Sequence, residues 1–233
     1  MARSIEELVE RQMKQWERSR RSAASELPRP CIAISRYPGA GGAALGQRVA
    51  EMLGYAFFGI ELVDWIARRT GYARQIVAGV DERIRNAIDR SVADSFRHER
   101  FTESDYLHQI VSTVTTLGER GGAVILGRGS PFILPSERAL RVFVVAPCAQ
   151  RVEQLSKLMS LTADQAALEV EREDASRREF LEHHFGRDPD DPTHYDLMIN
   201  MGTLSLDAAA ALLVDALLVR FPTTVREQLR GPV

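Results

Sequence analysis

The sequence is poor in cysteine and contains no long apolar run. Only Cys31 and Cys148 occur among 233 residues, and each lies in or beside an apolar stretch, which favours two small core residues over a disulfide. A membrane-spanning helix needs about 18 or more consecutive apolar residues, and the chain has no such run. The opening residues, MARSIEELVERQ, are too charged for a signal peptide. These absences predict a cytoplasmic protein with no membrane segment.

A large excess of one charge is also missing. The chain has 30 basic and 32 acidic residues and a formal net charge of -2, whereas a general nucleic-acid binder carries a broad basic surface. We therefore expect no nucleic-acid partner, and any anion-binding site must be local. Hydrophobic residues make up 45% of the chain, which is enough to bury the core of one domain, with or without a small lid.

The N-terminal residues have the pattern of an amphipathic leader helix. Ser4 and Glu7 have the spacing of a capping box, and a proline-containing linker follows at residues 22–30. Residues 1–30 are thus interpreted as a leader and linker, and residues 222–233 as a tail. The leader either packs on its own domain or binds a second subunit, so a homodimer through this helix is one interpretation. Its apolar stripe consists of Ile5, Leu8, Val9, Met13 and Trp16.

Between these ends, short apolar runs alternate with helical patterns. This alternation predicts an α/β domain over residues 31–221, with a parallel five-stranded sheet and helices on both faces. In such sheets ligands bind at the carboxyl ends of the strands. The expected strands are residues 31–35, 55–58, 123–126, 141–146 and 196–199.

A glycine-rich turn follows the first expected strand. The segment SRYPGAGGAALG at residues 35–46 turns tightly into a helix, so that backbone N–H groups and the positive end of the helix converge. This geometry favours a phosphate, although a tight turn without a ligand remains an alternative. Compared with the pattern GxxxxGK[ST], the lysine is replaced by Gly42. The expected phosphate cradle consists of Gly39, Ala40, Gly41, Gly42 and Ala43.

Five segments together resemble the cytidylate-kinase-like family, in that family's order. They are SRYPGAGG with LGQRVAEMLGYAFF, VILGRGS at 124–130, LRVFVVAP at 140–147, the D-x-x-R of Asp174 and Arg177, and YDLMINMGTLSLDAA at 195–209. The resemblance implies a P-loop NTPase-like fold with a helical lid around residues 160–195. It also implies that the γ-phosphoryl group of ATP is transferred, with Mg²⁺, to a nucleoside monophosphate, a pyrimidine one in this family.

The resemblance assigns roles to arginines, because phosphoryl transfer depends on neutralising charge. Arg36 would supply the cation that the missing lysine does not, and Arg172 and Arg177 would close over the phosphates from the lid. Arg128 would contact the phosphate of the acceptor, with Asp174 and Arg178 also on the substrate side. For each of these residues an ordinary surface ion pair is the alternative.

Several positions depart from the family pattern. Ala43 and Ala44 stand where relatives have an Arg-Glu pair, and Gly59 and Ile60 stand where they have an Asp-Arg pair. Asp64 is interpreted as one exposed acid on an ordinary helix, with compensation for the missing Asp-Arg pair as the alternative. No acidic residue ends the third or fourth strand, so Mg²⁺ would be held mainly by phosphates and water. A second hypothesis is therefore a catalytically weakened nucleotide-binding relative that acts through protein contacts.

Overall fold

The computed structural model describes residues 29–68 and 104–222. The helical pattern of the sequence also predicts a helix at residues 81–96. That stretch, the predicted leader helix and nearly all of the linker and of the C-terminal tail lie outside the described residues. Among the helices of the described residues, none is long and apolar enough to cross a membrane.

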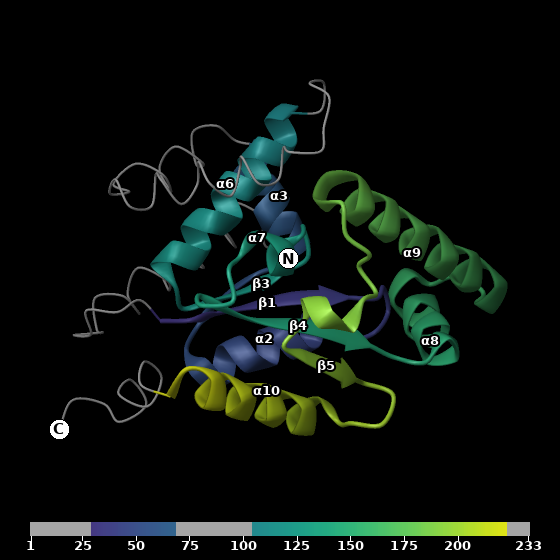
Figure 1. The fold of residues 1–233 in the computed structure, drawn as a ribbon. Helices are drawn as coiled ribbons and strands as arrows, with labels where there is room; N and C mark the ends of the chain where they lie inside the picture. Colours follow the sequence, from purple (N-terminus) through teal and green to yellow (C-terminus); the bar gives the residue numbers. More distant parts are fainter. Residues whose placement is uncertain (1–28, 69–103, 223–233) are drawn as a thin grey trace, which may run out of the picture.

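Five parallel strands form one sheet in the order β2-β3-β1-β4-β5 (Figure 1). The predicted parallel five-stranded sheet is therefore confirmed, and the strand boundaries agree with the prediction to within two residues. The strands are β1 Cys31–Arg36, β2 Ala56–Phe58, β3 Ala123–Leu126, β4 Ala139–Val145 and β5 Leu197–Asn200.

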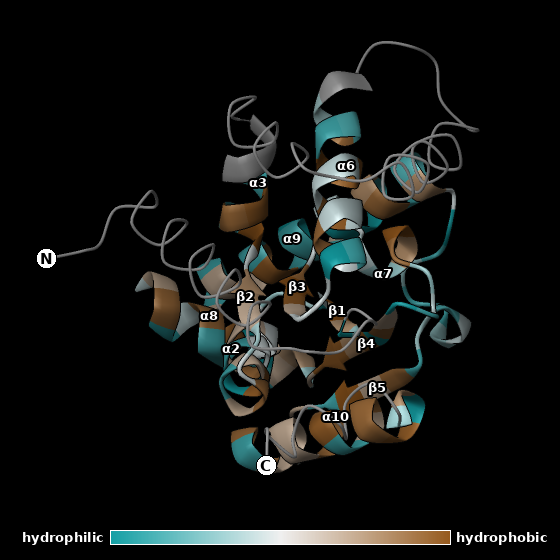
Figure 2. Cartoon of the chain, turned by 90° about the vertical axis from the view of Figure 1, so that its left-hand side faces the viewer, coloured by the Kyte–Doolittle hydropathy of each residue, from teal (hydrophilic) through white to brown (hydrophobic). Residues whose placement is uncertain are grey.

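Helices cover both faces of the sheet because the central strands are apolar on both sides. In β1, Cys31 and Ala33 belong to one buried cluster, whereas Ile32 and Ile34 belong to the other. Successive side chains of a strand point to opposite faces, so a continuous apolar run fits only a sheet that is buried on both sides. Figure 2 shows the largely brown β4 and β5 beside α10.

Two groups of helices provide this cover. One face packs against α3 Ile60–Arg68, α6 Ser104–Arg120 and the short α7 Ser130–Ile133. The other face packs against α2 Gly42–Leu53 and α10 Leu206–Arg220. Gly54 follows the apolar pattern of this helix, which predicts a cap there. The cap is confirmed, since Gly54 adopts the left-handed conformation with φ 64° and its N–H donates to the last turn.

A helical hairpin lies beyond the carboxyl ends of the strands (Figure 1). It consists of α8 Cys148–Met159 and α9 Ala163–Phe185, and a loop with a short 3₁₀ helix at Pro192–His194 leads from it to β5. Thr162 and Gln165 have the spacing of a capping box, and this box is present at the start of α9. Leu155, Ala166 and Val170 form a small apolar cluster within the hairpin, separate from the two sheet clusters.

The two cysteines differ in their surroundings. Cys31 is fully buried, and burial raises the pKa of its thiol to about 12. Cys148 is exposed at the first residue of α8. The prediction that both are core residues is thus wrong for Cys148, because β4 ends at Val145 and the chain has left the sheet before position 148. Both thiols are free, as the sequence predicted.

Candidate functional site

A cavity of about 230 Å³ opens at the carboxyl edge of the sheet. The chain lines it with the end of β1 and the turn after it, the segment that follows β3, the start of α3 and one face of α9. This is the edge at which parallel sheets bind ligands, and it is the edge at which the sequence analysis expects the site. Its polar lining residues are Ser35, Arg36, Arg128, Glu173, Ser176 and Arg177.

Arg36 is the cation of this cavity that lacks a counter-ion. Among residues 29–68 and 104–222, no hydrogen bond or ion pair engages its guanidinium. Burial, followed by repulsion from Arg177 and Arg128, lowers the pKa of Arg36. A partly buried charge that is repelled by two like charges is stabilised by any anion that enters the cavity.

Arg128 is presented by an unusual turn after β3. It has a φ of +52°, and its neighbours Gly127 and Gly129 also have positive φ. Its guanidinium donates through Nε and Nη2 to the two carboxylate oxygens of Asp64 on α3. Asp64 is only 17% exposed at its side chain. The interpretation of Asp64 as an ordinary exposed acid is therefore wrong, because the α3 face that carries it packs toward the turn.

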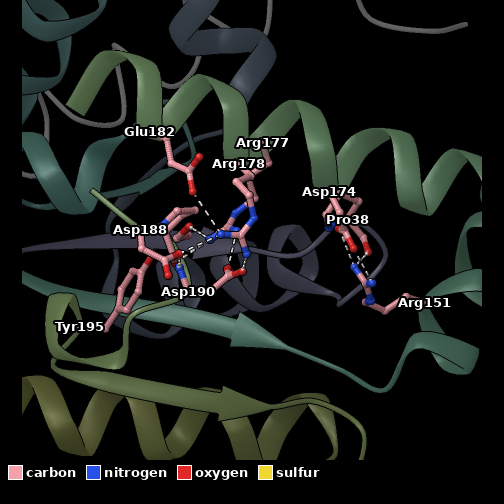
Figure 3. A network of polar contacts seen from close by, with 11 residues as sticks. Pro38, Arg151, Asp174, Arg177, Arg178, Glu182, Asp188, Asp190 and Tyr195 are labelled. Carbon is pink, nitrogen blue, oxygen red and sulfur yellow. Dashed lines mark hydrogen bonds and ion pairs between the residues drawn. The ribbon is translucent and has the colours of Figure 1, made fainter. Parts of the chain in front are cut away.

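Arg177 is held by contacts inside the protein. Its side chain is 7% exposed, and its guanidinium donates to Asp190 Oδ1 at 2.9 Å, Ser35 Oγ at 3.1 Å and the Pro189 carbonyl at 3.1 Å (Figure 3). Its Cζ also lies 4.7 Å from the ring centroid of Phe143. Arg177 thus lines the cavity while joining α9 to β1 and to the loop before β5.

Arg172 and Arg178 do not line the cavity. Arg172 is 64% exposed and pairs with Glu169 and Glu173 on its own helix. Arg178 pairs with Glu182, Asp188 and Asp190. The face of α9 that lines the cavity carries Glu173, Ser176, Arg177, Phe180 and Leu181, which is the spacing of one helical stripe. Positions 172 and 178 lie to either side of this stripe, so the structure does not bring them into the predicted site.

Asp174 is predicted on the substrate side with the lid arginines, but it does not line the cavity and pairs instead with Arg151 of α8. The two side chains form a two-point ion pair of 2.8 and 2.7 Å (Figure 3). Arg151 also donates to the Pro38 carbonyl at 3.4 Å, and its Cζ lies 4.6 Å from the ring centroid of Tyr37. The sequence analysis missed Arg151, because only its place soon after β4 distinguished it from other helical arginines.

The glycine-rich turn is shaped by close packing. Gly39 and Gly41 have φ values of +75° and +80°. A Cβ atom on Gly39 would lie 2.6 Å from the Arg151 carbonyl oxygen, and one on Gly42 would lie 2.8 Å from Arg36 Cβ. Ala40 is buried and Ala43 is exposed. The first N–H groups of α2 have no acceptor within the helix, and the backbone of Gly42 lies close to the side chain of Arg36.

The donors at this edge suit an anion better than a metal ion. Three guanidinium groups line the cavity, whereas residues 39–43 of the glycine-rich turn are not among its lining residues. Guanidinium groups bind phosphate oxygens well. No group of three or more His, Cys, Asp or Glu side chains that could hold a metal was found in the described part of the chain. These residues therefore fit the phosphates of a nucleotide, with any Mg²⁺ carried by phosphates and water.

A parallel sheet with a glycine turn after β1 and an arginine-lined cavity defines a P-loop-type α/β protein. The chain belongs to the cytidylate kinase-like family, whose model matches residues 31–203. The resemblance inferred from five sequence segments is thereby confirmed. The family match supports a nucleotide-binding phosphotransferase.

Individual relatives are distant. The cytidylate kinase of Staphylothermus marinus is 24% identical over 181 residues, which cover 76% of this chain and 89% of that protein. The uronate isomerase of Corynebacterium glutamicum is 30% identical over 106 residues, which cover 45% of this chain but only 20% of that protein. A solved structure of an uncharacterized protein from Eubacterium ventriosum has a TM-score of 0.62 at 17% identity, and the match covers 81% of this chain and 98% of that one. The solved structure supports the fold alone.

The close approach of Gly39 to α8 can be tested with one methyl group. We expect Gly39→Ala to lower the free energy of unfolding by at least about 1 kcal/mol more than Gly54→Ala, because overpacking against a backbone carbonyl adds to the strain of positive φ. Gly54 is a matched control, since its φ is +64° and nothing lies within 4 Å of an added Cβ. Urea unfolding measures both variants, and equal losses would contradict the close packing.

The Arg151–Asp174 pair can be tested by a double-mutant cycle. With Arg151→Gln and Asp174→Asn we expect a favourable coupling free energy of about 1 kcal/mol, because the Arg151 side chain is 7% exposed. The pair Lys157–Glu153 on the same hairpin is exposed on both sides and serves as the control, with no measurable coupling expected. The cycle uses chemical unfolding, and additive effects of the two changes would show that the pair contributes nothing.

Proposed function

We propose that this chain is an ATP-dependent kinase that phosphorylates a nucleoside monophosphate. The observation that carries the proposal is the uncompensated guanidinium of Arg36, which lies at the carboxyl edge of the sheet between the glycine-rich turn and the cavity. Membership of the cytidylate kinase-like family supports the same class of reaction.

The glycine-rich turn is the proposed holder of the ATP phosphates. Backbone N–H groups of residues 39–43 would donate to them, and Arg36 would add the positive charge that a lysine supplies in the GxxxxGK[ST] pattern. Bound ATP supplies the phosphoryl group to be transferred, together with Mg²⁺ on its phosphates. Arg36 would neutralise negative charge as it develops during transfer, which is the main task of the protein in this chemistry.

The cavity is the proposed place for the acceptor. Arg128 lines its far side after β3, and its Cζ lies 5.8 Å from the ring centroid of Phe180 on α9. An aromatic ring and a guanidinium together suit a ligand with a flat ring and a phosphate. A pyrimidine acceptor is proposed from the family and from its relative named cytidylate kinase.

The hairpin of α8 and α9 is proposed to act as the lid. Its small separate cluster is proposed to let it move as a unit. Arg177 and Arg151 provide polar ties to the rest of the domain, and Phe185 at the end of α9 packs against the sheet core. Closure over the cavity would exclude water from the transferred phosphoryl group. In this proposal Arg177 and Asp174 position the lid, and the exposed Arg172 and Arg178 lie on its outer side. A cytoplasmic location and a homodimer through the leader helix stay predictions.

The role of Arg36 leads to a direct test by substitution. We expect Arg36→Gln to lower kcat/KM for ADP production from ATP and cytidine monophosphate by about 100-fold or more, because one charge-stabilising donor is lost. Arg48→Gln is the control, since Arg48 pairs with Asp207 on the surface, and it should retain activity.

The outcomes separate the two hypotheses. Each nucleoside monophosphate is assayed in turn with ATP and Mg²⁺, and ATP binding is measured by calorimetry. Full activity in Arg36→Gln would overturn the proposed site. ATP binding by the wild-type protein without turnover of any monophosphate would favour the alternative, a nucleotide-binding relative that acts through protein contacts.

A further inference from the structure

We propose that Asp64 is a positioning residue, which holds Arg128 so that one edge of its guanidinium faces the cavity and receives the phosphate of the acceptor. This inference rests on the proposed function, because it concerns the same cavity. Asp64 itself would not touch the substrate. It would act through Arg128, and Tyr106 would in turn orient Asp64.

The contact between the two side chains leaves part of the guanidinium available. Arg128 uses Nε and Nη2 for Asp64, whereas a guanidinium carries five N–H donors. Arg128 lines the cavity, so its remaining N–H donors, including both on Nη1, are available to a ligand there. A two-point ion pair on one edge also fixes the plane of the group. Arg128 is thus pre-oriented before any ligand enters.

The backbone at Arg128 points to the same conclusion. Gly127, Arg128 and Gly129 have φ values of +76°, +52° and +70°, and a left-handed conformation is unfavourable for arginine. Such conformations persist where the surrounding structure determines them, and they gather at ligand sites. The turn directs the side chain toward α3, where Asp64 is the residue that receives it.

Charge balance explains why a carboxylate is needed there. Arg36, Arg128 and Arg177 line one cavity. Arg177 and Arg128 repel Arg36 more than the carboxylates of Glu173 and Glu61 attract it. Asp190 is the counter-ion of Arg177, and Asp64 is the counter-ion of Arg128. Without Asp64, Arg128 would gain by turning away from Arg36 into water. The Asp64 carboxylate thus keeps Arg128 at the cavity. Arg36 remains as the positive charge that a bound anion would neutralise.

Tyr106 holds the carboxylate from the other side. Its hydroxyl donates to Asp64 Oδ1 at 2.8 Å, and it comes from α6, which packs against α3. Asp64 thus accepts from two side chains on separate elements. This support limits rotation of the carboxylate, so that both of its oxygens face Arg128.

The test compares affinity with turnover. In Asp64→Asn we expect the KM for cytidine monophosphate and the Kd for inorganic phosphate to rise about tenfold, as for loss of a charged hydrogen bond, while kcat changes less than about threefold. Tyr106→Phe should show a smaller shift in the same direction. Asp207→Asn, which removes a surface partner of Arg48, is the control and should change neither constant.

A double mutant shows whether Asp64 acts through Arg128. In Arg128→Gln protein, Asp64→Asn should cause no further loss of phosphate affinity, because the group that it positions is gone. Additive losses would overturn the proposal, and so would tighter phosphate binding in Asp64→Asn, which would show that the carboxylate competes with the ligand. If Asp64→Asn fails to fold, Tyr106→Phe carries the test, and an unchanged phosphate affinity would then overturn it.

Failure of the kinase proposal would give a different result from failure of the positioning role of Asp64. Wild-type protein that turns over no monophosphate would contradict the kinase proposal. Phosphate binding that still depended on Asp64 through Arg128 would support the positioning role even then.

Discussion

Repulsion among three guanidinium groups is the constraint on which the carboxyl edge of this protein depends. Arg36, Arg128 and Arg177 share one cavity, and such a cluster is stable only if carboxylates or a ligand balance it. Asp64 and Asp190 balance two of the three arginines. These acids come from α3 and from the loop before β5, so the electrostatics of the cavity join distant parts of the fold.

The same contacts link the glycine-rich turn to the helical hairpin. Tyr37, at the start of the turn, lies 4.6 Å from Arg151 Cζ and 5.1 Å from Arg177 Cζ, measured to the centroid of its ring. Both arginines come from the hairpin, and each is tied to an acid, Asp174 or Asp190. The hairpin is therefore joined to the turn through charge and an aromatic ring, rather than through a continuous apolar core. Such joints are weaker than core packing, and they suit the proposed lid.

The sequence predicted the structural features that depend on residues close together in the chain. The strands, the glycine turn and the cap at Thr162 follow local patterns, so they were correctly predicted from composition and spacing. Asp64 with Arg128 and Asp174 with Arg151 are 64 and 23 residues apart, and no local pattern records such pairs. Arg172 and Arg178 were assigned with Arg177 from their position on one helix, but the direction in which each side chain points depends on how α9 is rotated against the sheet.

The difference between the two thiols has a practical consequence. Cys31 is sealed inside the sheet, where its burial keeps the thiol protonated, whereas Cys148 is exposed at the first turn of the hairpin. Since the chain contains no other cysteine, a maleimide dye should react with the native protein at Cys148 alone. The natural sequence thus carries a single attachment point for a fluorescent reporter at the base of the proposed lid, close to the part whose movement it would record.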